Sequence, residues 1–218
     1  MILYRCLTIF CLGFLLFPLG CSTAGRPILI PGSSEDLQDC MSLFPSGPWE
    51  SVHRIEADLG TGLSFLLLGV TRGDPQEVHL QSLLLSPEGF TLFEGELRKD
   101  KIVVHKAVPP FDSPSFAQGM MNDVAFLFLS PSISPNHWGR AADGTRLCFF
   151  EELDGFQTEV RRSPDQDWQI LRRNDQGQLI KKVSLKRPFV QGLSSSLDLE
   201  SFNPISYKLK MILIPQRP

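Results

Sequence analysis

The fold is decided by the stretch SVHRIEAD, residues 51–58, in which side chains of different character alternate along the chain. His53, Ile55 and Ala57 fall on one side of an extended chain, and charged residues occupy the positions between and after them. A period of two residues is typical of a β-strand that has one buried and one solvated face. The stretch therefore predicts an antiparallel sheet with one apolar face.

Most of the remaining chain repeats this arrangement of a short strand followed by a turn. Gly60–Gly62 and Ser86–Gly89 are rich in the residues that a reversal of the chain needs. The segments between such turns predict about nine or ten strands. Those after the first are expected near residues 63–70, 78–84, 90–98, 102–106, 146–150, 156–161, 168–170, 179–185 and 207–213.

Two segments have the period of a helix instead. Residues 35–44 are expected to form a short amphipathic helix with Ser34 as its N-cap. A second helix is expected to begin near Pro114, because the Pro-rich segment before it breaks the preceding strand. Residues 138–144 and 188–199 lack a strand pattern and are expected to be irregular. A short helix over residues 195–200 is the alternative for the end of the second segment. The apolar stripe of the second helix consists of Phe116, Met120, Val124 and Leu127.

These elements predict a mainly β (α+β) fold, a strongly curved antiparallel sheet with helices on its concave face. Such a sheet is an open β-barrel with a helical lid, because the helices cover the apolar face in place of a second sheet. The alternative is a closed eight-stranded barrel, against which the inserted helix and the surplus of strands count. Residues 35–218 are expected to form this single domain.

The N-terminal segment predicts export and attachment to a membrane. Residues 1–20 have one positive charge and an apolar run too short to span a bilayer, as in a signal peptide. Gly20-Cys21 at its end resembles the lipobox of bacterial lipoproteins, a likeness that implies lipidation of Cys21 and a lipidated tether over residues 21–34. The alternative is ordinary cleavage after Ser22-Thr23-Ala24, which would release a soluble exported protein.

The remaining cysteines, the histidines and the charged residues give no support for a metal site, for nucleic-acid binding or for catalysis. Cys40 and Cys148 could form a disulfide in an oxidising compartment. We favour two buried free thiols, because a hydrophobic core of this size is stable without a disulfide. The spacing of Cys and His residues gives no support for a metal or another cofactor. A formal net charge of −3, spread along the chain, does not suggest nucleic-acid binding. No nucleophile stands in a Gly-x-Ser-x-Gly arrangement, so neither catalytic residues nor an enzyme are expected.

The order of the elements, together with three short motifs, resembles the LolA/LolB-like superfamily. The motifs are the turn Leu84–Phe90, the Asp-containing helix segment Met120–Val124 before Ser130-Pro131, and Tyr-x-Leu-x-Met-x-Leu over 207–213. The resemblance implies an open barrel with a lid helix and an apolar cavity that binds acyl chains, such as palmitate, or the lipid part of a lipoprotein. The chain departs from LolB in that residues 63–68 form a strand pattern in place of a protruding leucine loop.

From this resemblance we expect a non-enzymatic, monomeric outer-membrane lipoprotein that faces the periplasm and binds a hydrophobic ligand. An envelope protein would be its further partner. The rival hypothesis is an accessory structural lipoprotein of an envelope complex, with a packed interior. Asp123 would either orient a ligand or hydrogen-bond a loop amide. The expected cavity wall consists of Val78, Leu80, Leu84, Phe93, Leu97, Phe116, Met120, Val124, Leu209 and Met211.

Overall fold

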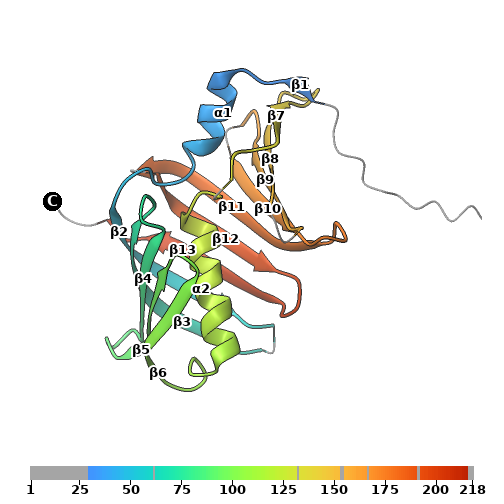
Figure 1. Cartoon of the computed structure of the whole chain (residues 1–218). Helices are drawn as coiled ribbons and strands as arrows, with labels where there is room; N and C mark the ends of the chain where they lie inside the picture. The colour runs from blue at the N-terminus through green and yellow to red at the C-terminus, as the bar shows by residue number, and fades with distance from the viewer. Residues whose placement is uncertain are drawn as a thin grey trace, which may run out of the picture.

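Thirteen strands form one open antiparallel sheet in the computed structural model, which describes residues 29–60, 62–131, 133–152, 155–165, 167–190 and 192–215. The strand order is β1-β7-β8-β9-β10-β11-β12-β13-β2-β3-β4-β5-β6, so β1 and β6 are the edges. Figure 1 shows the sheet curling around the space that holds the helices. The strands are β1 (Ile30–Pro31), β2 (Trp49–Asp58), β3 (Ser64–Asp74), β4 (His79–Leu85), β5 (Thr91–Arg98), β6 (Lys101–Ala107), β7 (His137–Arg140), β8 (Arg146–Glu151), β9 (Gln157–Arg162), β10 (Trp168–Arg173), β11 (Leu179–Val190), β12 (Leu193–Ser201) and β13 (Tyr207–Leu213).

One apolar row crosses eight of these strands in register. Each member of the row pairs directly with the next, so all of the side chains lie on the same face. Most of them are buried, and the two half-buried members, Leu209 and Phe65, pack against the core. This face is the concave one. The row runs through Cys148, Val160, Ile170, Val183, Leu199, Leu209, Ala57 and Phe65.

Two helices lie over the concave face, at opposite ends of the sheet (Figure 1). Helix α1 (Ser34–Met41) begins at Ser33, whose side chain and that of Asp36 form a capping box. Helix α2 (Pro114–Phe128) begins at Ser113, whose hydroxyl accepts a hydrogen bond from the Phe116 backbone N–H at 3.2 Å. α1 contacts β7, β8 and β9, whereas α2 contacts β4, β5 and β6.

Helix α1 is fastened to the sheet by a disulfide and by buried ion pairs. Cys40 is bonded to Cys148 in β8, at a sequence separation of 108. Asp36 accepts a hydrogen bond from Arg140 Nη2 at 2.8 Å and lies 3.2 Å from Arg146 Nε. Burial alone would raise the pKa of Asp36, but hydrogen bonds from Ser33 and Arg140 outweigh it and hold this pKa below its usual range. The carboxylate therefore stays ionised and keeps α1 in place.

The architecture expected from the sequence is confirmed, and several details are corrected. The five strands expected between the helices are β2 to β6, and both helices exist. The N-cap of α1 is Ser33 and not Ser34, and residues 30–31 of the expected tether pair with β7 as β1. Residues 138–140, part of the segment 138–144 that was expected to be irregular, belong to β7.

Two further expectations were wrong. The Ser-rich segment 193–201 is strand β12 and not a loop or helix, because its leucines supply the inward side chains of a strand pattern that the serines obscure. Ser194 Oγ donates to the Lys186 carbonyl at 2.6 Å and receives the Lys186 N–H at 3.1 Å, next to the irregular register there. The preference for free thiols was also wrong, since Cys40 and Cys148 form a disulfide. None of the helices among the described residues is both long and apolar enough to span a bilayer.

The disulfide is expected to stabilise the domain without being essential for its folding. Closing a loop of 108 residues limits the unfolded chain and adds roughly 3–5 kcal/mol to the free energy of unfolding. We therefore expect urea unfolding of the Cys40→Ala/Cys148→Ala protein to stay cooperative, at a lower midpoint. Reductant should lower the midpoint of the wild type and leave that of the double variant unchanged. An unchanged urea midpoint of the wild type after complete reduction of the disulfide would contradict this prediction.

Candidate functional site

The candidate site is the contact between α2 and the concave face of the sheet. Met121 points from the middle of α2 onto Phe93 and Gly95 of β5. A Cβ atom at Gly95 would lie 2.7 Å from the Phe93 ring and 3.3 Å from Met121 Sδ. Glycine is therefore required at this position for the helix to approach the sheet so closely.

Aromatic side chains hold both ends of α2. Near its N-terminus, the Phe116 ring packs edge-on against Phe111, with ring centroids 5.3 Å apart. At its C-terminus, the Phe128 ring lies 4.9 Å from Trp49 and 5.6 Å from His53, between ring centroids. The C-terminal end of α2 therefore lies on the start of β2, while the helix as a whole lies against β4, β5 and β6.

Nine of the ten residues expected to line a cavity belong to the apolar core or pack against it. Leu80, Leu84, Phe93, Leu97 and Met211 are buried in one apolar cluster. The other members of the expected wall that join them are half-buried and pack against this cluster: Phe116, Met120, Val124 and Leu209. The structure thus brings nine of the ten residues together and shows their side chains filling the interior.

Val78 is the exception, and the expected face of α2 is rotated. Val78 lies in a turn between β3 and β4 with a φ of 50° and an exposed fraction of 40%, so it does not share a face with Leu80. On α2 the buried apolar side chains are Ala117, Met121, Leu127 and Phe128. Leu127 belongs to the expected stripe and is buried, whereas its other three members are half-buried and pack against the core. The helix therefore faces the sheet about one residue further along than expected.

Asp123 connects α2 to the far half of the sheet. Its carboxylate accepts hydrogen bonds from Lys181 Nζ of β11 and from the Tyr207 hydroxyl of β13. Burial first, and then the nearby Asp123 charge, raises the pKa of Tyr207 well above its usual range, so this hydroxyl keeps its proton and donates. The expectation that Asp123 would bond a loop amide was wrong; its partners are two side chains from strands.

Three polar side chains in β2 have buried atoms without hydrogen-bond partners. These are Trp49 Nε1, Ser51 Oγ and both ring nitrogens of His53. All three side chains lie on the inner face of the strand, where burial lowers the pKa of His53 to about 4. His53 was expected to be an ordinary inward residue of this strand. The missed signal was the occurrence of polar groups at three successive inward positions.

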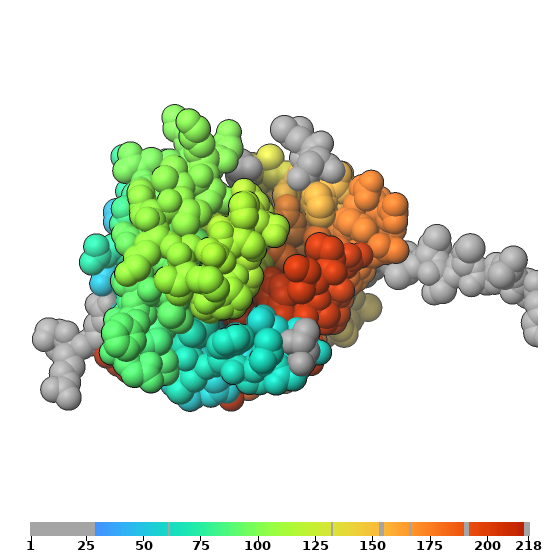
Figure 2. Space-filling model, turned by 90° about the horizontal axis from the view of Figure 1, so that it is seen from below, coloured from blue at the N-terminus to red at the C-terminus, as the bar shows by residue number. Residues whose placement is uncertain are grey.

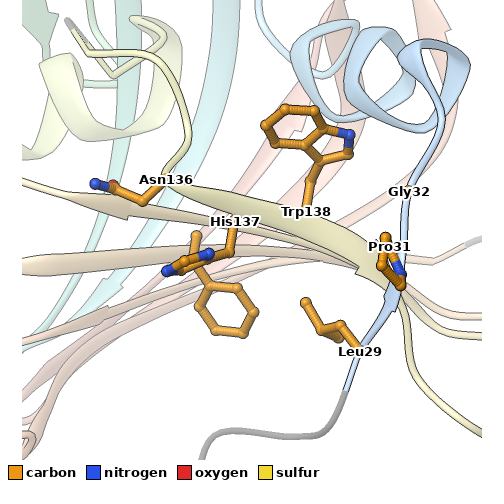
Figure 3. Close-up of a pocket in the computed structure, with 7 residues that line it drawn as sticks. Leu29, Pro31, Gly32, Asn136, His137 and Trp138 are labelled. Carbon is orange, nitrogen blue, oxygen red and sulfur yellow. The ribbon is translucent and has the colours of Figure 1, made fainter.

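The surface pockets lie at the ends and edges of the sheet. A cavity of about 420 Å³ lies where β1 pairs with β7 and is lined by Leu29, Pro31 and Trp138, among others. Figure 3 shows Trp138 turned toward α1, where its Nε1 donates to the Ser33 carbonyl at 3.1 Å, and His137 turned to the other side. A second cavity, of about 510 Å³, lies at the top end of β2 beside Trp49 and Gly73. Within the described ranges, no three His, Cys, Asp or Glu side chains form a metal-ligand group.

Exposed apolar side chains gather at the bottom of the molecule. Leu63 precedes β3 with an exposed fraction of 56%, and Phe202 and Ile205 lie between β12 and β13 with 45% and 65%. These two connections are neighbours, since a Cβ atom at Gly60 would lie 3.2 Å from the Ser206 carbonyl oxygen. Figure 2 shows the connections side by side at this end (cyan and red). An apolar end of this kind is typical of a surface that meets a membrane or a partner.

The comparisons with known proteins identify the fold. No protein-family model and no curated protein matches the sequence. A crystal structure of a LolA superfamily protein from Nitrosomonas europaea has a TM-score of 0.52 and 8% identity, and covers 87% of this chain and 96% of that chain. A candidate outer membrane lipoprotein-sorting protein domain from Vibrio parahaemolyticus has a TM-score of 0.49 and 9% identity. The match covers 84% of this chain and 90% of that chain. The Nitrosomonas likeness confirms the expected LolA/LolB-like architecture of an open sheet with a helical lid.

The Asp123 contacts should hold α2 closed. Asp123→Asn would leave the buried Lys181 ammonium without its counter-charge and is expected to lower the free energy of unfolding by about 3–5 kcal/mol. Removing both charges, with Asp123→Leu and Lys181→Met, should cost much less. Tyr207→Phe should cost about 1 kcal/mol. Urea unfolding measures these changes, and amide hydrogen exchange should show faster opening of α2 in the Asn variant. A double variant as unstable as Asp123→Asn would argue against the pairing.

Proposed function

We propose that this protein binds acyl chains, or another hydrophobic ligand of similar shape, between α2 and the concave face of the sheet. It would act in lipid or lipoprotein transfer at the outer membrane, without catalysing a reaction. The observation that carries the proposal is the arrangement of a separate helix over an apolar face in an open sheet of the LolA-like type. A helix held mainly by apolar side chains can be replaced there by an apolar ligand.

A ligand must displace α2, because the space is filled in the closed form. Leu80, Phe93 and Met121 have exposed fractions of 0%. An acyl chain of sixteen carbons gains roughly 12 kcal/mol on burial, at about 0.8 kcal/mol per methylene. A bilayer offers the same gain, so transfer between membrane and protein would be nearly neutral and could run in either direction. The apolar end formed by Leu63, Phe202 and Ile205 would bring the protein to the bilayer surface.

The rival function is that of an accessory structural lipoprotein that binds other envelope proteins and no lipid. The complete burial of the residues under α2 favours this rival, since a packed interior needs no ligand. The two functions differ in one measurable respect, which is saturable binding of an apolar probe. They share the fold and the proposed membrane anchor.

Binding of an uncharged dye tests the proposed site. N-phenyl-1-naphthylamine fluoresces more strongly in apolar surroundings, and we expect it to saturate the purified Cys21→Ser protein. Leu84→Glu would place a carboxylate among apolar side chains and should reduce dye affinity by more than about tenfold. Leu84→Met keeps the volume and polarity of the site and should bind as the wild type does.

Two controls keep this test decisive. Circular dichroism must show that Leu84→Glu is folded, and Met120→Glu, at a half-buried position of α2, replaces it if it is not. A folded wild type that does not bind the dye saturably would favour the structural rival. Unchanged binding by both Glu variants would place the ligand elsewhere.

We also propose that Cys21, which lies outside the described residues, carries the lipid anchor, with residues 1–20 as the signal peptide and the outer membrane as the destination. The basis is the sequence Leu19-Gly20-Cys21 after a short apolar run. Several acyl chains on one cysteine would give stable anchoring. Cys21→Ser should therefore move the protein from the membrane fraction to the soluble fraction or leave it as precursor. A wild-type N-terminal peptide without lipid mass, in a soluble protein, would refute the anchor.

A further inference from the structure

The inner face of β2 carries a row of polar atoms that nothing in the described structure satisfies. Trp49, Ser51 and His53 occupy alternate positions, so their side chains follow one another along the strand at about 6.6 Å intervals. Their exposed fractions are 6%, 1% and 1%. Trp49 Nε1, Ser51 Oγ and both His53 ring nitrogens have no hydrogen-bond partner. Buried polar atoms are nearly always paired in folded proteins, so four unpaired atoms in one row call for a partner.

The surroundings of this polar row are polar but uncharged. Ser51 pairs with Thr71 of β3, which pairs with Ser82 of β4, and both of these side chains are buried. The described inner positions of β2, β3, β4 and β5 hold no Asp, Glu, Lys or Arg. The row therefore offers hydrogen bonds without any compensating charge.

The polar row lies where a ligand under α2 would have its upper end. Phe128, at the C-terminus of α2, packs on Trp49 and His53 and so covers the row in the closed form. Trp49 also lines the cavity of about 510 Å³ at the top of β2. A ligand that displaces α2 would thus have its chain beside Leu84 and Phe93 and its head beside the polar row, next to that cavity.

We propose that the polar row of Trp49, Ser51 and His53 binds the uncharged head group of an acyl ligand, through ester or amide carbonyls and hydroxyls. The proposal rests on the proposed function and names its ligand class. Trp49 can only donate a hydrogen bond, Ser51 can donate and accept, and a neutral imidazole has one donor and one acceptor nitrogen. Carbonyl oxygens and hydroxyls satisfy this set.

An ionised carboxylate does not fit the row. At the row its charge would be buried without a cation, which costs more than its hydrogen bonds return. Arg72, which lines the neighbouring cavity, is paired with Glu50 at 2.6 Å, and Lys181 lies three strands away on β11. Burial lowers the pKa of His53 to about 4, so the imidazole is neutral near neutral pH and supplies no positive charge. The site therefore selects acylglycerols or acyl amides over free fatty acids.

Displacement of N-phenyl-1-naphthylamine from the Cys21→Ser protein tests this selectivity. The competitors are monopalmitoylglycerol and palmitate, used below their micelle-forming concentrations at about pH 8, where a carboxyl of ordinary pKa is ionised. We expect the glycerol ester to displace the dye at a concentration at least about tenfold lower, a difference of about 1.4 kcal/mol. Equal or stronger displacement by palmitate would overturn the head-group proposal and leave the proposed function standing. If neither competitor displaces the dye, both proposals fail.

Variants of the polar row separate ligand binding from a structural role. Ser51→Ala and His53→Leu should each lower the preference for the ester by at least about threefold. The same variants should unfold at an equal or higher urea concentration, because they remove unpaired buried polar atoms. Ser201→Ala is the control, since this buried hydroxyl donates to the Ile205 carbonyl at 2.9 Å. It should lower stability and leave the preference unchanged. A preference that survives in both row variants would overturn the proposal.

Discussion

The constraint on which this structure depends is the apolar row that crosses the sheet in register from Cys148 to Phe65. A sheet with one continuous apolar face must cover that face, either by closing on itself or by receiving other elements. The sheet stays open, with β1 and β6 at its edges, so it must be covered by helices. Because two helices share this task among the described residues, the position of each decides what else the concave face can hold.

The two helices are held by different kinds of interaction. α1 is joined to the sheet by a covalent bond and by carboxylates that pair with arginines of β7, β8 and β9. α2 is held by apolar and aromatic contacts and by one buried carboxylate, Asp123. Apolar contacts have no directional requirement and can be exchanged for contacts with another apolar body. A disulfide cannot be exchanged in this way. This asymmetry makes α1 the fixed cover of the sheet and α2 the cover that a ligand can replace.

The sequence predicts the parts of this fold that follow from alternation, and misses those that depend on distant partners. The pattern around His53, Ile55 and Ala57 indicates the inner face of β2 correctly. The serines of β12 conceal a strand, because its pairing with β11 and β13 is not a local property. The inward turn of Asp123 depends on Lys181 and Tyr207, which are far away in sequence. The pairing of Cys40 with Cys148 likewise depends on where α1 docks. For the site, alternation predicts that Leu80, Leu84 and Phe93 are buried, but not that Val78 lies in a turn.

The polar row in β2 is the part of the interior whose residues least suit an apolar core. Apolar residues at positions 51 and 53 would bury as well as their neighbours Ile55 and Ala57 do, and would remove three of the four unpaired atoms of the row. Interior sites that lower the stability of the empty protein are typical of binding sites, since the missing hydrogen bonds are formed only with the ligand. Glycines at positions 69 and 73 face the same strand, and the side chains of Ile55 and Trp49 lie over them. Phe128 of α2 packs on Trp49 and His53 from the other side, so departure of α2 would uncover the polar row.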